Sequence, residues 1–338
     1  MNKPLKVLIP IAAFSFSGMA LLGYAISPDV ALAATLVSSN VSYRVHDGQT
    51  DNQFSTAQPA QTSNNNQPLS ASAVAADRGT GGNAAASSAL GVLKAASTAG
   101  AIGVSAISGP NQPFTTSTAH VTASASWSDD VPILAPGYSG SGIAHVVLRV
   151  DASIGSLWAD GSVTTENKAG GGEAFAGADF QVNHVSLFSF RELVSQQGYV
   201  SSTTTILNGA AYPGSAASFW ADVAGNHTLD IPFTFGTPLS LYAFSNVYAD
   251  AGAAGRGATG NGYADLGNSI YWGGIVSVTD SNGLPVTGFT ALGTTGHNWQ
   301  ASAVPVPEPE TWAMLLAGLG LVGWMARRKP ACVARSGS

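Results

Sequence analysis

Apolar and polar residues alternate along the segment Thr228–Phe235, and this alternation strongly limits what the chain can fold into. Every second position is a large apolar residue: Leu229, Ile231, Phe233 and Phe235. Successive side chains of a β-strand point to opposite faces of a sheet, whereas an amphipathic helix repeats its apolar positions every three to four residues. The period of two therefore predicts a strand with one buried face and one solvated face.

Pro232 falls on the polar side of this strand, and proline has no N–H to donate to a neighbouring strand. It therefore predicts a strand at the edge of its sheet or at a bulge. The dipeptide Asn282-Gly283 favours the positive φ angles of a tight hairpin turn. Further strands are predicted over 35–45, 143–151, 182–191, 239–249, 270–278 and 284–289, the last two joined through that turn.

Short strands punctuated by Gly, Pro and Asn are typical of two packed antiparallel sheets. The Ala-rich stretch 84–107 fits weak strand and loop better than helix, because its glycines disfavour a helix. The predicted fold class is therefore all-β, an antiparallel β-sandwich of the jelly-roll or immunoglobulin-like kind. We expect a loose, low-complexity arm over 34–81 and the sandwich over 82–303.

The first 33 residues have the three parts of a secretory signal peptide. Lys3 and Lys6 precede an apolar run, which ends in the small-residue pattern Ala31-Leu32-Ala33. This order predicts export and cleavage by signal peptidase after Ala33, with Ala31 and Ala33 forming the cleavage site. A permanent amino-terminal anchor is the alternative.

The segment 304–338 combines a stiff stretch, an apolar run and a basic cluster. Pro305, Pro307 and Pro309 alternate with other residues, which keeps the backbone extended. The uncharged run 312–326 predicts a short transmembrane helix, because tryptophan at both ends suits the two membrane interfaces. A buried helix is the alternative for so short a run. The residues expected to form the membrane segment and its basic stop are Trp312, Leu315, Leu316, Leu319, Leu321 and Trp324, then Arg327, Arg328 and Lys329.

The sequence Val306-Pro307-Glu308-Pro309, followed by the apolar run and the basic cluster, resembles the PEP-CTERM sorting signal of Gram-negative surface proteins. The resemblance implies recognition by an exosortase-type membrane protease, removal of the tail, and export together with extracellular polysaccharide. It also implies transient anchoring in the inner membrane before the protein reaches the cell surface or the extracellular matrix. The extension 330–338, which holds the single cysteine, Cys332, departs from this pattern.

A weaker resemblance to the same family covers the segment 229–299. In many PEP-CTERM ectodomains a strand pair with a glycine-containing turn precedes a Ser-Gly-x-x-Trp-like motif and then the sorting signal. Here the corresponding motif is Thr295-Gly296-His297-Asn298-Trp299. The resemblance implies a β ectodomain without a defined activity.

The portion 34–307 is sparsely charged and acidic, with 7 Lys and Arg against 16 Asp and Glu. Nucleic-acid binding requires clustered basic residues, so we expect no nucleic-acid partner. With no cysteine before Cys332, this portion has no disulfide and depends on packing and sheet hydrogen bonds.

Few residues point to chemistry. The six histidines show no metal-ligand spacing, and we expect no cofactor. Asp129 and Asp130, placed on a loop, are a weak candidate for binding Ca²⁺, with solvated loop acids as the alternative. Exposed aromatic residues suit stacking on sugar rings, with core packing as the alternative. The aromatic candidates are Trp127, Trp158, Trp220, Tyr242, Tyr248, Trp272 and Trp299.

The main functional hypothesis is a non-enzymatic surface or matrix protein that is associated with exopolysaccharide or biofilm and sorted by an exosortase. A carbohydrate-binding module on the cell surface is the second hypothesis, with exopolysaccharide as its candidate partner. A secreted hydrolase with a carboxylate site built from loops is the third.

Overall fold

The computed structural model describes residues 34–46, 51–63, 68–103, 116–150, 158–161, 169–195, 200–201, 204–207, 210–213, 225–255, 257–266 and 270–303. These residues contain strands, turns and bends but no helix, so the all-β prediction is confirmed for this part of the chain. This described part of the chain accordingly contains no helix long and apolar enough to span a membrane. The predicted signal peptide, sorting motif and carboxyl-terminal helix lie outside the described residues.

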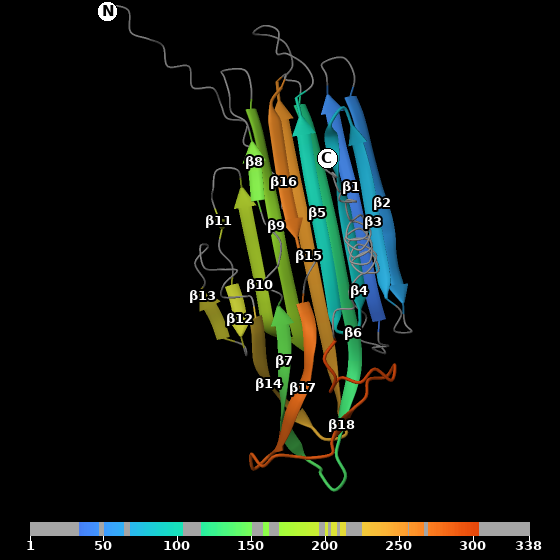
Figure 1. The fold of residues 1–338 in the computed structure, drawn as a ribbon, viewed down its shortest axis with the longest axis vertical. Coiled ribbons are helices and arrows are strands. Elements are labelled where there is room, and N and C mark those ends of the chain that lie inside the picture. The colour runs from blue at the N-terminus through green and yellow to red at the C-terminus, as the bar shows by residue number, and fades with distance from the viewer. Residues whose placement is uncertain are drawn as a thin grey trace, which may run out of the picture. The chain divides into compact units, whose positions relative to one another are not determined.

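The larger of two antiparallel sheets has ten strands, in the order β13-β12-β10-β9-β15-β6-β1-β2, with β11 beside β10 and β18 beside β6. Its longest strands, β6 and β15, pair side by side at its centre (Figure 1). The strands are β1 (Ala34–His46), β2 (Asp51–Ser63), β6 (Thr116–Leu134), β9 (Ala169–Val182), β10 (Val185–Ser195), β11 (Val200–Ser201), β12 (Thr204–Leu207), β13 (Ala210–Pro213), β15 (Pro238–Ala254) and β18 (Thr290–Ala291).

The smaller sheet has eight strands and divides into two branches at β5. One side of β5 pairs with β4, and the other side pairs with both β16 and β17. Beyond β16 lies β8, and beyond β17 lie β7 and then β14. The strands are β3 (Leu69–Asp77), β4 (Thr80–Ala89), β5 (Val92–Ile102), β7 (Ser141–Val150), β8 (Trp158–Gly161), β14 (Gly225–Thr234), β16 (Thr259–Asp265) and β17 (Ile270–Asp280).

The two sheets stack face to face and enclose one hydrophobic core. In β14 the predicted inward residues Leu229, Ile231 and Phe233 are buried, and in β7 the same holds for every second residue from Ala144 to Val150. The period of two therefore identified the buried faces correctly, and the arrangement is that of a sandwich. The two sheets together hold eighteen strands among the described residues, more than the seven to nine of an immunoglobulin domain or the eight of a jelly roll, so neither topology describes them.

One half of the sandwich is unusually thin. Here Cα atoms of β5 lie within 8 Å of those of β6 and β15, and β16 approaches β9 equally closely. Stacked sheets are ordinarily about 10 Å apart. The close approach follows from the sequence, because the facing residues are mostly alanine, glycine and serine. At Gly172 of β9 an added methyl group would overlap the backbone carbonyl of Asn261 in β16.

The other half, under β7, β14 and β17, is filled by large aromatic side chains. Trp127 of β6 and Phe180 of β9 come from the larger sheet, and Trp272 of β17 comes from the smaller one. Trp299, from the segment after β18, packs its ring 5.0 Å from that of Trp127 and 5.1 Å from that of Trp272, measured between ring centroids. The core therefore changes from small to large residues along the sandwich.

The segment 34–81 was expected to be a loose arm with one strand at 35–45. That strand is present as β1, but 51–63 and 69–77 of the expected arm also form strands, β2 and β3. Ala71, Ala73 and Ala75 of β3 are buried against the larger sheet. Because the two sheets lie close together here, these small side chains fill the space between them, and β3 contains few large apolar residues. The expectation of strand and loop over 84–107 agrees with β4 and β5, which are joined by a turn at Gly91.

Other predicted strands differ in detail. β14 pairs with β7 and with no other described strand, so the edge position predicted from Pro232 is confirmed. The turn at Asn282-Gly283 is present, with Gly283 at a φ of 78°. The strand predicted over 284–289 is wrong: only a bridge between Thr279 and Pro285 forms before the chain leaves to pair with β6. The strand predicted over 182–191 contains the turn between β9 and β10.

Candidate functional site

A line of aromatic and polar side chains runs along the outer face of β15. The alternate residues Leu241, Ala243, Val247 and Ala249 are buried in the core, so the residues between them face outward. From one end to the other these outward residues are Tyr242, Phe244, Asn246, Tyr248 and Asp250. Each is half-buried except Asp250, which is buried.

The neighbouring strands add their own side chains on both sides of this line. Antiparallel pairing places Ser128, Ser126, Ser124, Thr122 and His120 of β6 beside the β15 residues in the same order. On the other side it places Gln181, Asp179, Gly177, Phe175 and Glu173 of β9. We call these three rows of side chains the outer strip.

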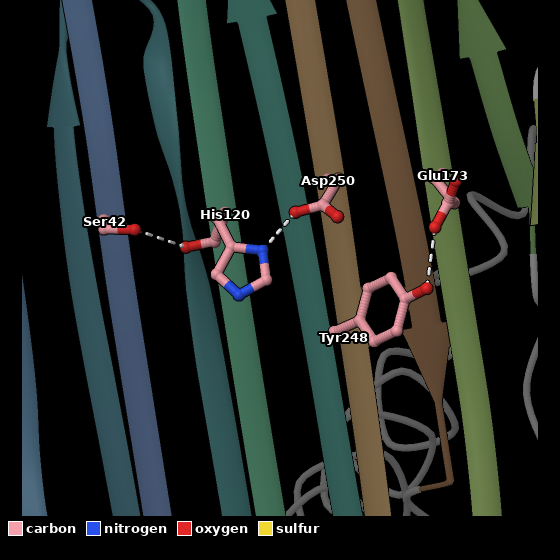
Figure 2. Close-up of polar contacts among 5 residues, drawn as sticks. All are labelled: Ser42, His120, Glu173, Tyr248 and Asp250. Carbon is pink, nitrogen blue, oxygen red and sulfur yellow. Dashed lines mark hydrogen bonds and ion pairs between the residues drawn. The ribbon is translucent and has the colours of Figure 1, made fainter. Parts of the chain in front are cut away.

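At one end of the outer strip four side chains form two polar pairs (Figure 2). Nδ1 of His120 contacts Oδ1 of Asp250, and the Tyr248 hydroxyl donates a hydrogen bond of 2.6 Å to Oε1 of Glu173. The ring of Tyr248 stacks on that of Phe175, with centroids 5.1 Å apart and planes 8° from parallel. Asp250 of β15 and Glu173 of β9 lie directly opposite each other on neighbouring strands. The donors His120 and Tyr248 therefore offset the repulsion between the two carboxylates.

Ser42 of β1 lies opposite His120 but does not form a nucleophilic triad with it. Its hydroxyl donates to the backbone carbonyl of His120, over 3.4 Å, and not to the imidazole (Figure 2). A serine nucleophile requires a hydrogen bond to the base that takes its proton. Ser42, His120 and Asp250 therefore lack the geometry for acyl transfer.

The pairs in the outer strip shift the pKa values of their members. The hydrogen bond to Asp250 raises the pKa of His120, against the opposing effect of burial. Burial, together with the hydrogen bond to Glu173, raises the pKa of Tyr248. The tyrosine is therefore a neutral donor at every physiological pH, whereas the histidine carries positive charge to higher pH than an ordinary imidazole.

Replacing Asp250 by asparagine is expected to lower the pKa of His120 back toward its ordinary value. In the native protein the raised pKa means that the pair stabilises the fold fully below about pH 6.5 and loses this contribution as the pH rises through the folded pKa. Urea unfolding at about pH 5 and about pH 9, with an NMR titration of the His120 imidazole, measures both effects. An unchanged imidazole titration in the variant would contradict the assignment.

The Ca²⁺ candidates Asp129 and Asp130 are not on a loop, as the sequence suggested, but inside β6. The Asp129 carboxylate is buried and accepts hydrogen bonds from the indole of Trp299 (2.7 Å), the Thr294 hydroxyl (2.8 Å) and the Thr294 amide (3.1 Å). A carboxylate surrounded by N–H and O–H donors is not arranged for a cation. The described residues contain no group of three or more His, Cys, Asp or Glu side chains placed to hold a metal ion.

The aromatic candidates fall into two sets. Trp127, Trp272 and Trp299 are buried in the core, so the proposal that they stack on sugars is wrong. Tyr242 and Tyr248 lie in the outer strip, as a sugar-stacking role requires. Trp158 belongs to β8, and Trp220 lies outside the described residues.

The segment after β18, residues 292–303, is tied to the sandwich through Trp299. The backbone carbonyl of Trp299 accepts hydrogen bonds from the indole of Trp272 (2.7 Å) and from the amide of Ile275 (3.0 Å). The amide of Ala303 donates to the carbonyl of Trp272 over 2.7 Å. Sequence reasoning missed this attachment, because Asp129 and Trp299 are 170 positions apart and nothing local marks them as partners.

The described structure ends at Ala303, and comparison with protein families finds a match directly after it. The model of the PEP-CTERM protein-sorting motif matches residues 305–329. The chain is a PEP-CTERM sorting-domain protein. The PEP-CTERM motif indicates exosortase-dependent sorting to the cell surface, with export, membrane-anchored transit and processing by an exosortase membrane protein. Neither curated proteins nor solved structures gave a match.

The matched range contains the residues on which the sequence resemblance rests, from Val306 to Lys329. The individual roles of Pro307-Glu308-Pro309, of the apolar run and of the basic cluster stay predictions, as does the cleavage site at Ala31 and Ala33.

Proposed function

We propose that this PEP-CTERM protein is a non-enzymatic component of the cell surface or extracellular matrix that associates with exopolysaccharide. The position of the sorting motif supports this proposal. It begins at residue 305, two residues after Ala303, whose amide is bonded to the sandwich. The folded unit is therefore the part that reaches the surface, and the tail is a delivery signal.

The apolar run suits a temporary membrane segment. Its 15 residues, 312–326, span about 22 Å as a helix at 1.5 Å per residue, less than the ~30 Å hydrocarbon core. Arg327, Arg328 and Lys329 resist crossing, since each charge at mid-bilayer costs roughly 2.5–3.5 kcal/mol on insertion scales. A segment of this kind holds the chain in the inner membrane with Pro307-Glu308-Pro309 on the outer side, where a protease meets an extended backbone.

Two features support a role without catalysis. The carboxylates of the outer strip are occupied by neighbouring donors, since Asp179 accepts hydrogen bonds from Ser186 and Gln181 and Glu173 accepts one from Tyr248. Asp129 and Asp130, which the sequence suggested as a pair of loop carboxylates, lie in β6 instead, with Asp129 buried. A carbohydrate-binding module is the second candidate function, favoured by the stacked pair of Phe175 and Tyr248 on an outer sheet face.

Two changes in the tail are expected to alter the fate of the protein without unfolding the sandwich. Glu308→Ala should leave the tail uncleaved, so that the protein accumulates in the inner membrane. Deletion of 312–329 should release unsorted protein into the periplasm, because the membrane segment is gone. Cell fractionation with immunoblotting measures both outcomes.

The matched control is Glu310→Ala, a glutamate directly after Pro309 and outside the Pro307-Glu308-Pro309 motif. It should be sorted like the unmodified protein. If Glu308→Ala and the deletion both reach the surface in normal yield and with normal mass, the tail is not a sorting signal.

A further inference from the structure

We propose that the outer strip is a binding site for a linear polysaccharide without anionic groups. This inference deepens the proposed function, because it names the surface and the class of polymer through which the protein would hold its matrix. It rests on four properties of the outer strip: its position, its aromatic faces, its polar borders and its charge.

The outer strip follows the centre of the larger sheet. β15 is bordered by β6 and β9 over most of its length, so the strip is a long, continuous face of the sheet. Side chains at every second position repeat about every 7 Å along a strand. A surface of this kind suits an extended polymer lying parallel to β15, with several sugar units in contact at once.

Aromatic rings occur at both ends of the outer strip. Tyr242 and Phe244 lie at one end, and Tyr248 stacked on Phe175 lies about 14 Å from Phe244 at about 3.4 Å per residue. Aromatic rings present apolar area that matches the C–H face of a sugar ring, and a tyrosine also carries a polar edge. The hydrogen bond to Glu173 and the stack on Phe175 fix the ring of Tyr248, so little rotamer entropy remains to be lost on binding.

Polar groups line the aromatic rings on both sides. The β6 row offers the half-buried hydroxyl groups of Thr122, Ser124 and Ser128, which both donate and accept hydrogen bonds, whereas Ser126 is buried. The β9 row adds the carboxylates of Glu173 and Asp179, whose oxygens have acceptor sites beyond those that take the hydrogen bonds from Tyr248, Ser186 and Gln181. Sugar hydroxyls donate to carboxylates and exchange hydrogen bonds with serine and threonine, so each flank of a neutral sugar finds partners.

The charge of the outer strip selects against anionic polymers. It holds three carboxylates, Glu173, Asp179 and Asp250, and one cationic group, His120. Arg191 of β10, opposite Gly177, borders the strip without reversing this balance. Uronate or sulfate groups laid on this surface would meet like charges, which weakens binding. A polysaccharide without anionic groups meets no such repulsion.

The test is affinity electrophoresis of the full chain in gels containing hydroxyethyl cellulose, a neutral polymer, or alginate, a polyuronate. We expect retardation by the neutral polymer and none by alginate at moderate salt. Tyr248→Ala should weaken binding to the neutral polymer by about tenfold, whereas Tyr248→Phe, which keeps the ring, should retain most of it.

The matched control is Tyr263→Ala. Tyr263 of β16 is also half-buried and donates its hydroxyl to a carboxylate, that of Asp265 at 2.9 Å, but it belongs to the smaller sheet. This variant should bind like the unmodified protein, with circular dichroism confirming the fold of each variant. The proposal is overturned if the neutral polymer causes no retardation, if alginate binds equally well, or if Tyr263→Ala loses as much affinity as Tyr248→Ala. Sorting is scored separately by cell fractionation, so failure of either hypothesis is recognised independently.

Discussion

Replacing Trp299 by alanine is expected to lower the free energy of unfolding by about 3–5 kcal/mol, the usual range for removing a fully buried tryptophan. Trp299 is 0% exposed and packs between Trp127 and Trp272. Its loss also leaves the Asp129 carboxylate without the indole donor, and an under-paired buried charge adds to the penalty. Urea unfolding followed by tryptophan fluorescence and circular dichroism measures the change.

Tyr138→Ala is the control for this experiment. Tyr138 is 41% exposed and contacts Phe235 at one end of the sandwich, so its loss should cost less than about 1 kcal/mol. Hydrogen exchange distinguishes local from global effects: in Trp299→Ala the amides of 292–303 should lose protection more than those of β15. If Trp299→Ala is no less stable than Tyr138→Ala, the proposed attachment of this segment is wrong.

Adding one methyl group at Gly172 is expected to destabilise the thin half of the sandwich by at least about 2 kcal/mol. In Gly172→Ala the new Cβ would overlap the backbone carbonyl of Asn261 in the opposite sheet. Backbone atoms of a paired strand cannot move aside as the end of a flexible side chain can, so the two sheets must separate locally. Thermal and urea unfolding of the full chain measures the loss.

Gly252→Ala provides the matched comparison. Gly252 is also within the larger sheet, on β15, but a Cβ added there would have no neighbouring atom of the described residues within 4 Å. The substitution also reduces the freedom of the unfolded chain, so we expect a stability equal to or up to about 1 kcal/mol above that of the unmodified protein. Equal losses at Gly172 and Gly252 would contradict the close approach of the two sheets.

The parts of the fold that the sequence predicts well are those with large apolar residues at every second position. Leu229, Ile231 and Phe233 mark β14 without ambiguity, because no other regular structure buries such a set on one side. β3 was missed for the opposite reason. Its buried positions are Ala71, Ala73 and Ala75, and alanine alternating with serine resembles a low-complexity linker.

Small residues can be recognised as core residues only when the opposite sheet is known to lie close by. At a short separation, their side chains are enough to fill the space between the two sheets. Alanine buries little area by itself, and its contribution here depends on the short separation of the sheets. Composition alone therefore assigned 34–81 to an arm, whereas the structure assigns most of it to three paired strands.

The candidate site was predictable in part. Tyr242 and Tyr248 could be placed on one strand face from their spacing, which the structure confirms. Their neighbours His120 and Glu173 come from strands about 130 and 75 positions away in the sequence. Their placement beside the tyrosines depends on strand order and register, which the alternation of apolar and polar residues does not specify. Asp129 shows the same limit, because its role became clear only from the position of Trp299.

The intact mass of the protein recovered from the cell surface shows whether this chain is exported and then delivered to the surface by its carboxyl-terminal motif. We expect a chain that begins at or near Ala34 and ends close to Pro307-Glu308-Pro309, without the apolar run and the basic cluster. Surface protein with the mass of the whole chain, from Met1 to Ser338, would contradict it.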